Sequence, residues 1–258
     1  MKVTLVPSAV AADGSAPASI QHLTSYLVDE SVVIDAGCVG FLDDPEKQAN
    51  VRRAFLSHTH LDHIASLPIL VENAYRAHRP GITIYGSAYV IACLKSNIFN
   101  WDVWPDFFAI STAETPFLRF ETLEPGRSVA VDGLLVTPIE VNHVVPTFGF
   151  VIEDENSAIV VSSDTGPTEA IWERARSTKN LKAVFLEATF PAEMHRLADL
   201  SKHLTTATFA REVEKIDRSV HVIAVHIKAR FHEQVVTELE ALRLANIEIG
   251  RFGIPYCF

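Results

Sequence analysis

The sequence predicts an α/β fold in which two β-sheets pack against each other and helices cover both outer faces. Two observations lead to this fold class: strand patterns dominate two separate stretches of the chain, and helical patterns finish each stretch. No linker, internal repeat or low-complexity segment separates the stretches, and 258 residues are enough for one large core. We therefore expect a single domain spanning residues 1–258.

Periodicity predicts the elements of the first half. Strands are expected at 2–6, 22–28, 31–35, 51–56 and 82–85. A helix is expected from Ile64 to His78, with Pro68 in its first turns, where proline is best tolerated. Ser87 is a typical N-cap residue, and it predicts a second helix that runs to about Asn97. Residues 98–108 follow neither period and carry two of the three tryptophans.

The second half again places strands before helices. Strands are expected at 118–121, 128–131, 134–141, 148–153 and 158–162. Helices and strands then alternate, with helices at 168–175, 205–215 and 233–245 and strands at 183–187 and 220–225. The two halves together account for the layered fold.

The composition limits which binding partners and which cellular compartment are expected. A net charge of −10 and a pI near 5.5 argue against a long nucleic acid as the main partner. The three cysteines are an odd number and form no CxxC pair, which fits a reducing cytoplasm rather than a disulfide framework. No stretch approaches the roughly 18 apolar residues of a membrane span, so no membrane partner is expected. We expect a cytoplasmic protein.

A histidine-rich motif follows the predicted strand 51–56 and reads His58-Thr59-His60-Leu61-Asp62-His63. Buried imidazoles and carboxylates need partners, and folding alone does not require so many in one loop. His58 and His60 share a face of an extended segment, whereas Asp62 and His63 lie across the turn into the next helix. Because zinc and similar divalent ions bind neutral imidazole and carboxylate, the motif predicts a metal site.

Three further polar residues each come just after an apolar run: His143, Asp164 and His226. One such residue alone could be a cap or a turn residue, as Asp164 could be before Pro167. With the motif, they make five histidines and two aspartates at equivalent positions. We assign His58, His60 and His143 to one ion and Asp62, His63 and His226 to a second ion, with Asp164 bridging both. A bridging carboxylate holds two cations roughly 3.5–4 Å apart.

This ligand pattern resembles that of the metallo-β-lactamase-fold hydrolases, and the resemblance covers essentially the whole chain from the first strand to the helix after His226. It implies an αββα sandwich of two mixed β-sheets flanked by helices, with the dinuclear site between the sheet ends. Two divalent ions are implied, with Zn²⁺ expected and Mn²⁺ or Fe²⁺ as alternatives. One departure is Ser163, which stands where the family commonly has glycine before the bridging aspartate.

A second pair of residues points to the reaction. Glu187 ends the strand 183–187, and His203 lies in Ser201-Lys202-His203-Leu204-Thr205. A histidine held by a carboxylate is suited to protonate a departing alkoxide. The alternative is an ordinary polar pair near a helix start.

Two phosphodiesterase branches of the superfamily resemble this chain. The class II 3′,5′-cyclic-nucleotide phosphodiesterases share Leu61, Leu204, Asp164-Thr165-Gly166-Pro167 and segments around 21–27 and 99–107. The tRNA 3′-end-processing endonucleases share Glu187-Ala188-Thr189-Phe190 but typically have Gly at position 61, Ser at position 204 and a basic arm. The charge favours the first branch. We expect hydrolysis of a small cyclic nucleotide, cyclic AMP foremost, to the nucleoside 5′-monophosphate; the tRNA endonuclease and a lactonase or esterase are the alternatives.

The resemblance and the motifs together assign roles. Asp62, Glu187 and His203 are the expected catalytic residues. Lys228 and Arg230 could bind phosphate, or be solvated charges at a helix entrance. Trp101 and Trp104 could stack on a base, although an aromatic lid or a subunit contact is the stronger interpretation of that stretch. A homodimer is compatible with the aromatic stretch.

Overall fold

A computed structural model shows two seven-stranded sheets packed face to face, and it describes residues 1–8, 22–75, 81–114, 116–216 and 220–258. The first sheet has the strand order β14 (Pro255–Cys257), β1 (Lys2–Leu5), β2 (Tyr26–Val28), β3 (Val32–Ile34), β4 (Arg53–Phe55), β5 (Ile82–Gly86), β6 (Leu118–Thr122). The second has the order β13 (Ile247–Ile249), β12 (His221–Val225), β11 (Leu181–Glu187), β10 (Ala158–Val161), β9 (Thr147–Glu153), β8 (Leu134–Val141), β7 (Val129–Val131).

Both sheets are mixed. In the first sheet, β3 to β6 run parallel, whereas β14, β1, β2 and β3 are antiparallel neighbours. In the second sheet, β10 to β13 run parallel and β7 to β10 antiparallel. Parallel strands need crossover connections, and these carry the helices.

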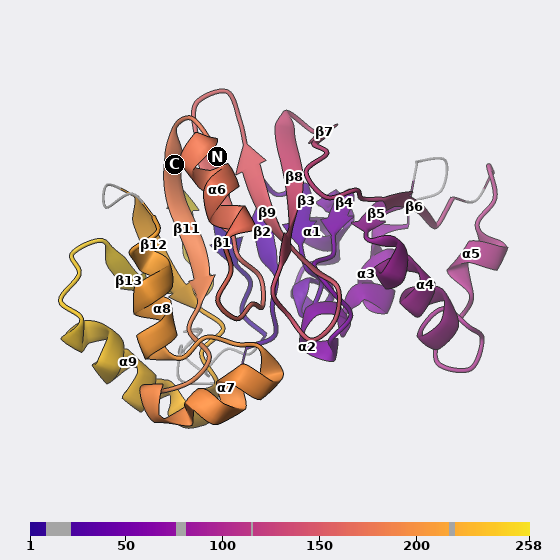
Figure 1. Ribbon diagram of the computed structural model, residues 1–258. Coiled ribbons are helices and arrows are strands. Elements are labelled where there is room, and N and C mark those ends of the chain that lie inside the picture. The colour runs from indigo at the N-terminus through magenta and orange to yellow at the C-terminus, as the bar shows by residue number, and fades with distance from the viewer. Residues whose placement is uncertain (9–21, 76–80, 115, 217–219) are drawn as a thin grey trace.

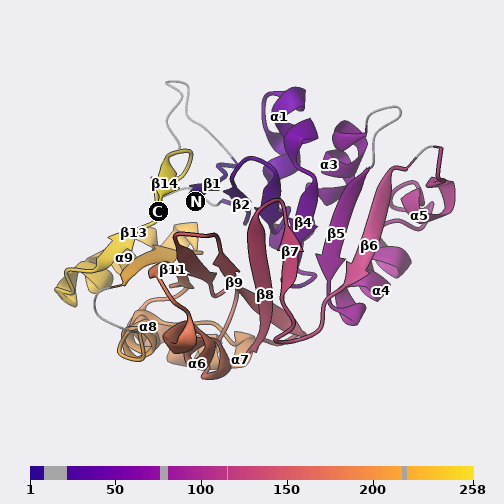
Figure 2. The same ribbon diagram turned by 90° about the horizontal axis from the view of Figure 1, so that it is seen from above.

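Helices cover both outer faces of the sandwich (Figures 1 and 2). The first sheet is covered by helices from the first half of the chain: α1 (Pro45–Asn50), α3 (Leu67–Ala74), α4 (Ala88–Asn97) and α5 (Phe107–Ile110). The second sheet is covered by α6 (Ala170–Ser177), α8 (Thr206–Val213) and α9 (His232–Ala241). Two short helices, α2 (Leu61–Ile64) and α7 (His195–Ser201), lie at the same edge of the sandwich (Figure 1).

The period of two along each strand divides the core into three layers. Ile159 and Val161 of β10 face the layer between the sheets, whereas Val160 faces the helices. In β3, Val32 and Ile34 again face inward while Val33 packs under the helices. Strands buried on both faces read as continuous apolar runs, which explains the strand patterns in the sequence. The predicted fold class is confirmed.

Three predicted elements are wrong in extent, and one of them is the helix expected at 233–245, because α9 already ends at Ala241. The helix expected at 64–78 is divided: α2 ends at Ile64 and α3 begins at Leu67. Pro68 has no N–H and its ring would clash with the carbonyl of Ile64 in a continuous helix, so a new helix begins with Pro68 in its first turn. The predicted end at His78 falls in 76–80, outside the described residues.

The strand expected at 22–28 is shorter, because β2 begins only at Tyr26. The backbone of Thr24 is used elsewhere: its N–H donates to the carbonyl of Asp62 at 2.7 Å, and its carbonyl accepts from Gly37 at 2.9 Å. A Cβ at Gly37 would lie 2.1 Å from the Asp62 carbonyl oxygen, so only glycine allows these segments to meet. The hydrogen bonds of Thr24 to Asp62 and Gly37 fix the 58–63 loop against the first sheet. Short elements that the sequence did not predict are α1, α5, α7, β13 and β14.

Within the described ranges, none of the helices has both the length and the apolar character needed to cross a membrane.

Candidate metal centre

The seven predicted ligands meet at one edge of the sandwich. The 58–63 motif follows β4 of the first sheet, whereas His143, Asp164 and His226 follow β8, β10 and β12 of the second. Their atoms fall into two groups that share Asp164. In each group one ligand atom per residue lies within 4.8 Å of the others: His58, His60, His143 and Asp164 in the first; Asp62, His63, Asp164 and His226 in the second. This division is the one that the sequence predicts.

The spacing of the donor atoms fits a cation in each group. Nε2 of His143 lies 3.3 Å from Nδ1 of His60, and Nε2 of His58 lies 3.7 Å from Oδ2 of Asp164. In the second group, Nε2 of His226 lies 3.3 Å from Oδ2 of Asp62 and 3.4 Å from Oδ1 of Asp164. Ligands at about 2.0–2.1 Å in tetrahedral geometry are separated by roughly 3.3–3.4 Å. Each group could therefore hold a divalent ion.

Buried polar atoms without partners support this interpretation. Among the described residues, Nε2 of His58 and Nε2 of His63 are buried and have no hydrogen-bond partner. Nε2 of His63 lies 3.3 Å from Oδ2 of Asp164, but not in hydrogen-bonding geometry. A buried unpaired donor or acceptor costs about 1–3 kcal/mol, so each of these atoms requires a ligand that the protein does not itself supply. The fit to metal ions comes from this donor set.

The imidazoles of His58, His63 and His143 are each held through Nδ1. Nδ1 of His63 donates to the buried carboxylate of Asp35 at 2.7 Å, and Nδ1 of His58 lies 2.9 Å from the Ser57 hydroxyl, which itself donates to Asp35 at 2.7 Å. Nδ1 of His143 donates to the carbonyl of Lys202 at 3.1 Å. These bonds fix the tautomer in which Nε2 carries the free lone pair. Asp35 and Ser57 were not predicted as part of the site, because their role appears only once β3 and β4 lie side by side.

The expected contact between Glu187 and His203 is present. Nδ1 of His203 donates to Oε1 of Glu187 at 2.8 Å, and Nε2 of His203 faces the cluster at 4.0 Å from Oδ2 of Asp164. The carboxylate of Glu187 is only 1% exposed. It also accepts from the backbone N–H of Thr165 at 2.7 Å and from that of Leu204 at 3.0 Å. These donors fix the Glu187 carboxylate in a position that orients Nδ1 of His203.

Thr189 connects this pair to the metal cluster. Its hydroxyl donates to Oε2 of Glu187 at 2.6 Å, so its oxygen can accept the Nδ1 proton of His226 at 3.0 Å. A hydroxyl has one hydrogen to donate, and this determines the direction of both bonds. Glu187 therefore holds His203 directly and His226 through Thr189. The Glu187-Ala188-Thr189-Phe190 segment was a recognisable signal, but the sequence did not reveal the link to His226.

The charges of the site are set by burial and by these contacts. Burial holds the pKa of His58 well below its usual value, and it lowers the pKa values of His60 and His143 as well. Burial alone would raise the pKa of Asp164, but the neighbouring imidazoles hold it well below the ordinary value. Burial lowers the pKa of His203, but the Glu187 carboxylate raises it by more. The pKa of His203 therefore lies above its ordinary value. These shifts favour neutral imidazoles in the first group and the protonated form of His203.

Left-handed backbone occurs at several residues of the site. Asp35, Ser163 and His226 have φ values of 59°, 53° and 58°. This explains why glycine is common at position 163 in the family, and Ser163 adopts the same left-handed conformation at some cost in strain. Strained backbone of this kind is often found where function fixes a side chain.

Replacing Thr189 by valine is expected to weaken metal binding at the Asp62–His63–His226 group by roughly 10–100-fold, the usual effect of losing a residue that orients a ligand. Thr189→Ser keeps the hydroxyl and is the matched control. Metal content per chain, measured after dialysis against a graded chelator, checks the prediction. Equal metal retention in the valine and serine variants would contradict the role of the hydroxyl.

Of the other predicted site residues, some lie at the metal cluster and others lie far from it. Nζ of Lys228 lies 3.6 Å from Oδ2 of Asp62, at the cluster. Arg230 is exposed in the turn before α9. Trp101 is 62% exposed, and Trp104 packs beside the outer cluster of the first sheet near Phe99 and Phe107. Their segment lies between α4 and α5 next to β6, two strands away from β4, at the end of the molecule opposite α9 (Figure 1).

The fold and the site together define a class, the metallo-β-lactamase-fold hydrolases. The chain belongs to the family described as the β-lactamase superfamily domain, which matches residues 32–227. The resemblance indicated by the 58–63 motif is thereby confirmed.

The curated relatives include cyclic-nucleotide phosphodiesterases and ribonucleases. The "Probable 3′,5′-cyclic-nucleotide phosphodiesterase" of Yersinia pestis is 26% identical over 235 residues, covering 80% of this chain and 65% of that protein. The 3′,5′-cyclic-nucleotide phosphodiesterase of Aliivibrio fischeri is 24% identical over 237 residues, covering 81% and 68%. Ribonuclease Z of Bacillus subtilis is 21% identical over 246 residues, covering 75% and 76%. The chain thus spans about two thirds of the length of the two phosphodiesterases.

Among solved structures, unliganded yeast PDE1 superposes with a TM-score of 0.76 at 16% identity, covering 98% of this chain and 97% of that chain. At this identity the likeness shows the fold.

Proposed function

We propose that this chain is a dinuclear-metal phosphodiesterase that hydrolyses 3′,5′-cyclic nucleotides, cyclic AMP foremost, to nucleoside 5′-monophosphates. The observation that carries the proposal is the Glu187–His203 pair, 2.8 Å apart, facing the His/Asp cluster at Asp164. A histidine held by a carboxylate in this position is suited to protonate an alkoxide that leaves from phosphorus. The two cyclic-nucleotide phosphodiesterases among the relatives support the choice of substrate.

Two divalent ions, Zn²⁺ in our proposal, would polarise the phosphoryl group and supply an activated water molecule. Asp62, Asp164 and the five imidazoles hold and orient these ions. Nε2 of His203 carries the proton that passes to the 3′-oxygen as its bond to phosphorus breaks. Glu187 keeps the His203 proton available by fixing Nδ1 and by stabilising the imidazolium. Lys228, beside Asp62, adds positive charge where the phosphate binds.

The direct test is hydrolysis of 3′,5′-cyclic AMP by protein reconstituted with zinc or manganese, with identification of the product. We expect 5′-AMP from the loaded protein and no turnover after chelation. Release of 3′-AMP would place the broken bond on the wrong side of phosphorus. No turnover from protein carrying about two metals per chain would reject cyclic AMP as substrate.

A tRNA 3′-end-processing endonuclease is the second candidate, favoured by the ribonuclease Z relative and the Glu187–Phe190 segment. It predicts cleavage of 3′-extended tRNA that weakens steeply with salt. The net charge of −10 argues against it.

A further inference from the structure

The loop that follows α4 exposes large apolar side chains although it is tightly held. Trp101 is 62% exposed and Val103 is 60% exposed. The side-chain amide of Asn100 donates to the carbonyl of Ser96 at 3.0 Å. Its Oδ1 accepts from the N–H of Asp102 at 3.1 Å and from that of Val103 at 2.9 Å. These bonds fix the loop to the last turn of α4, so the exposed side chains are held in defined positions.

The backbone of Trp101 is strained. Its φ is 72°, in the left-handed region that a residue with so large a side chain rarely adopts. Its N–H donates to the carbonyl of Trp104 at 3.0 Å, which closes the loop. Asparagine or glycine would take this conformation at lower cost, so local folding does not explain a tryptophan here. Strain of this kind is typical of a side chain with a functional contact.

A row of uncharged side chains on α4 leads to this loop. Tyr89, Ala92 and Ser96 follow one another at helical spacing, and all three are exposed. Lys95, the charged residue of this helix, instead lies over the ring of Phe108, 4.5 Å from its centroid. We call the row and the exposed loop side chains together the α4 strip, which consists of Tyr89, Ala92, Ser96, Trp101 and Val103.

The charge of the chain indicates what covers this strip. The net charge is −10, so most of the surface of one copy repels that of another. The segment 88–103 contains one lysine and one aspartate and is neutral overall. Two copies can meet at this segment without that repulsion, whereas a basic partner would be attracted to acidic surface elsewhere. The strip is therefore suited to contact a second copy of the chain.

The order of the side chains along the strip is self-complementary. Large rings stand at its two ends, Tyr89 and Trp101, and the small residues Ala92 and Ser96 lie between them. In an antiparallel pair about a two-fold axis, the Tyr89 end of one copy lies opposite the Trp101 end of the other. The small side chains allow the two helices to approach closely.

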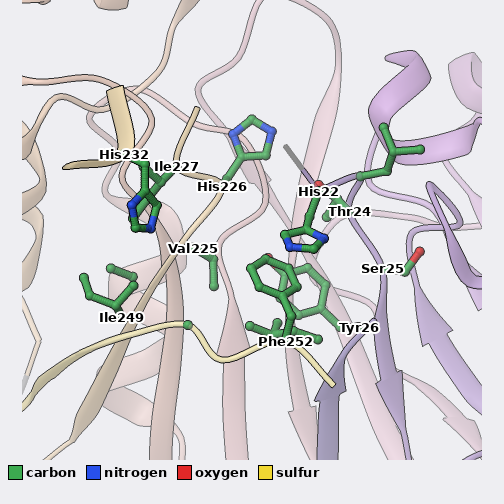
Figure 3. Close-up of a pocket in the computed structure, with 14 residues that line it drawn as sticks. His22, Thr24, Ser25, Tyr26, Val225, His226, Ile227, His232, Ile249 and Phe252 are labelled. Atoms are coloured by element: carbon green, nitrogen blue, oxygen red, sulfur yellow. The ribbon is translucent and has the colours of Figure 1, made fainter. Parts of the chain in front are cut away.

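The pocket beside His226, between the start of β2 and the end of β12, is filled by the chain itself (Figure 3). The rings of His22 and Phe252 stack on each other with their centroids 3.8 Å apart. The remaining cavity has about 30 Å³, which is room for ordered water and not for a partner side chain. The α4 strip, by contrast, lies open on the outer side of the first sheet, at the end of the molecule away from α9 (Figure 1).

We propose that the α4 strip is the interface through which two copies of this chain form a dimer related by a two-fold axis. Sedimentation velocity over a concentration series tests it. We expect a monomer–dimer equilibrium for the unmodified chain, and a dissociation constant weakened roughly 30-fold or more in Trp101→Asn, the usual effect of losing an aromatic anchor. Tyr89→Ser should weaken the dimer as well. Leu244→Asn, at a leucine that is 38% exposed after α9, is the matched control and should dimerise like the unmodified chain.

A second measurement distinguishes an interface role of Trp101 from a packing role within its own chain. Thermal unfolding of Trp101→Asn and of the unmodified chain is compared at a concentration where both are monomeric. We expect an equal or higher unfolding temperature for the variant, because asparagine adopts left-handed backbone at lower cost than tryptophan. A lower unfolding temperature would assign Trp101 to packing and overturn the proposal. So would a chain that is monomeric throughout the concentration series, or a dimer that neither α4 variant weakens.

Discussion

Asp164→Asn is expected to abolish turnover almost completely, by about 10³-fold or more. Asp164 is 2% exposed and is the one residue common to both ligand groups, with Oδ2 3.3 Å from His63 and Oδ1 3.4 Å from His226. An asparagine keeps the shape but loses the negative charge and one acceptor oxygen. Weakening both ions removes water activation and charge stabilisation together, and about 4 kcal/mol of lost transition-state stabilisation is roughly 10³-fold in rate.

Metal analysis and activity are to be measured on the same samples. We expect the metal content to fall from about two ions per chain to one or fewer, with the loss of turnover following it. Asp102→Asn, at an exposed aspartate outside the cluster, is the matched control. Full metal content with intact turnover in Asp164→Asn would show that Asp164 does not bridge two ions.

The sequence predicted the layers and the grouping of the candidate ligands, because both depend on local patterns. Continuous apolar runs mark strands buried on both faces, and each run is followed by its polar residue at the same edge of the sandwich. The 58–63 motif, His143, Asp164 and His226 could therefore be assigned to two groups that the geometry reproduces. Short elements such as α7 and β14 carry too few residues for a period to be recognised.

What the sequence could not show are contacts between segments that are far apart along the chain. Asp35 reaches His63 across 28 positions and Thr189 reaches His226 across 37, and no spacing rule connects either pair. The same limit applies to the tryptophans. Residues 98–108 suggested an aromatic lid or a subunit contact, with base stacking as the weaker alternative, and only the order of the strands places this stretch beside β6.

One carboxylate links the two functions of the site. Glu187 holds His203, the proposed acid, directly, and through Thr189 it orients His226, a proposed metal ligand. A change at Glu187 therefore affects both acid catalysis and metal binding. His203 is therefore the more informative place to test acid catalysis, because Thr189 contacts both His226 and Nδ1 of His203.

His203→Ala is expected to lower turnover of cyclic AMP by roughly 10²–10⁴-fold, the usual contribution of a general acid. The ring of His203 makes no bond needed to hold the ligands, so about two metals per chain should remain. The loss should be much smaller for bis(p-nitrophenyl) phosphate, because p-nitrophenolate leaves without being protonated. Comparison of the two substrates on metal-verified samples separates an acid from a ligand. A parallel loss of metal would make His203 a ligand, and equal losses on both substrates would exclude the acid role.

The acid role of His203 also predicts how the pH dependence of kcat/KM changes in the variants. His203 must be protonated to act, and the Glu187 carboxylate outweighs burial and raises its pKa, which extends the active form to higher pH. In Glu187→Gln that support is removed, so the pKa of His203 falls and the basic limb of the kcat/KM profile should move to lower pH. In His203→Ala this limb should disappear from the profile for cyclic AMP. An unchanged basic limb in both variants would assign it to another group and remove His203 from the proton transfer.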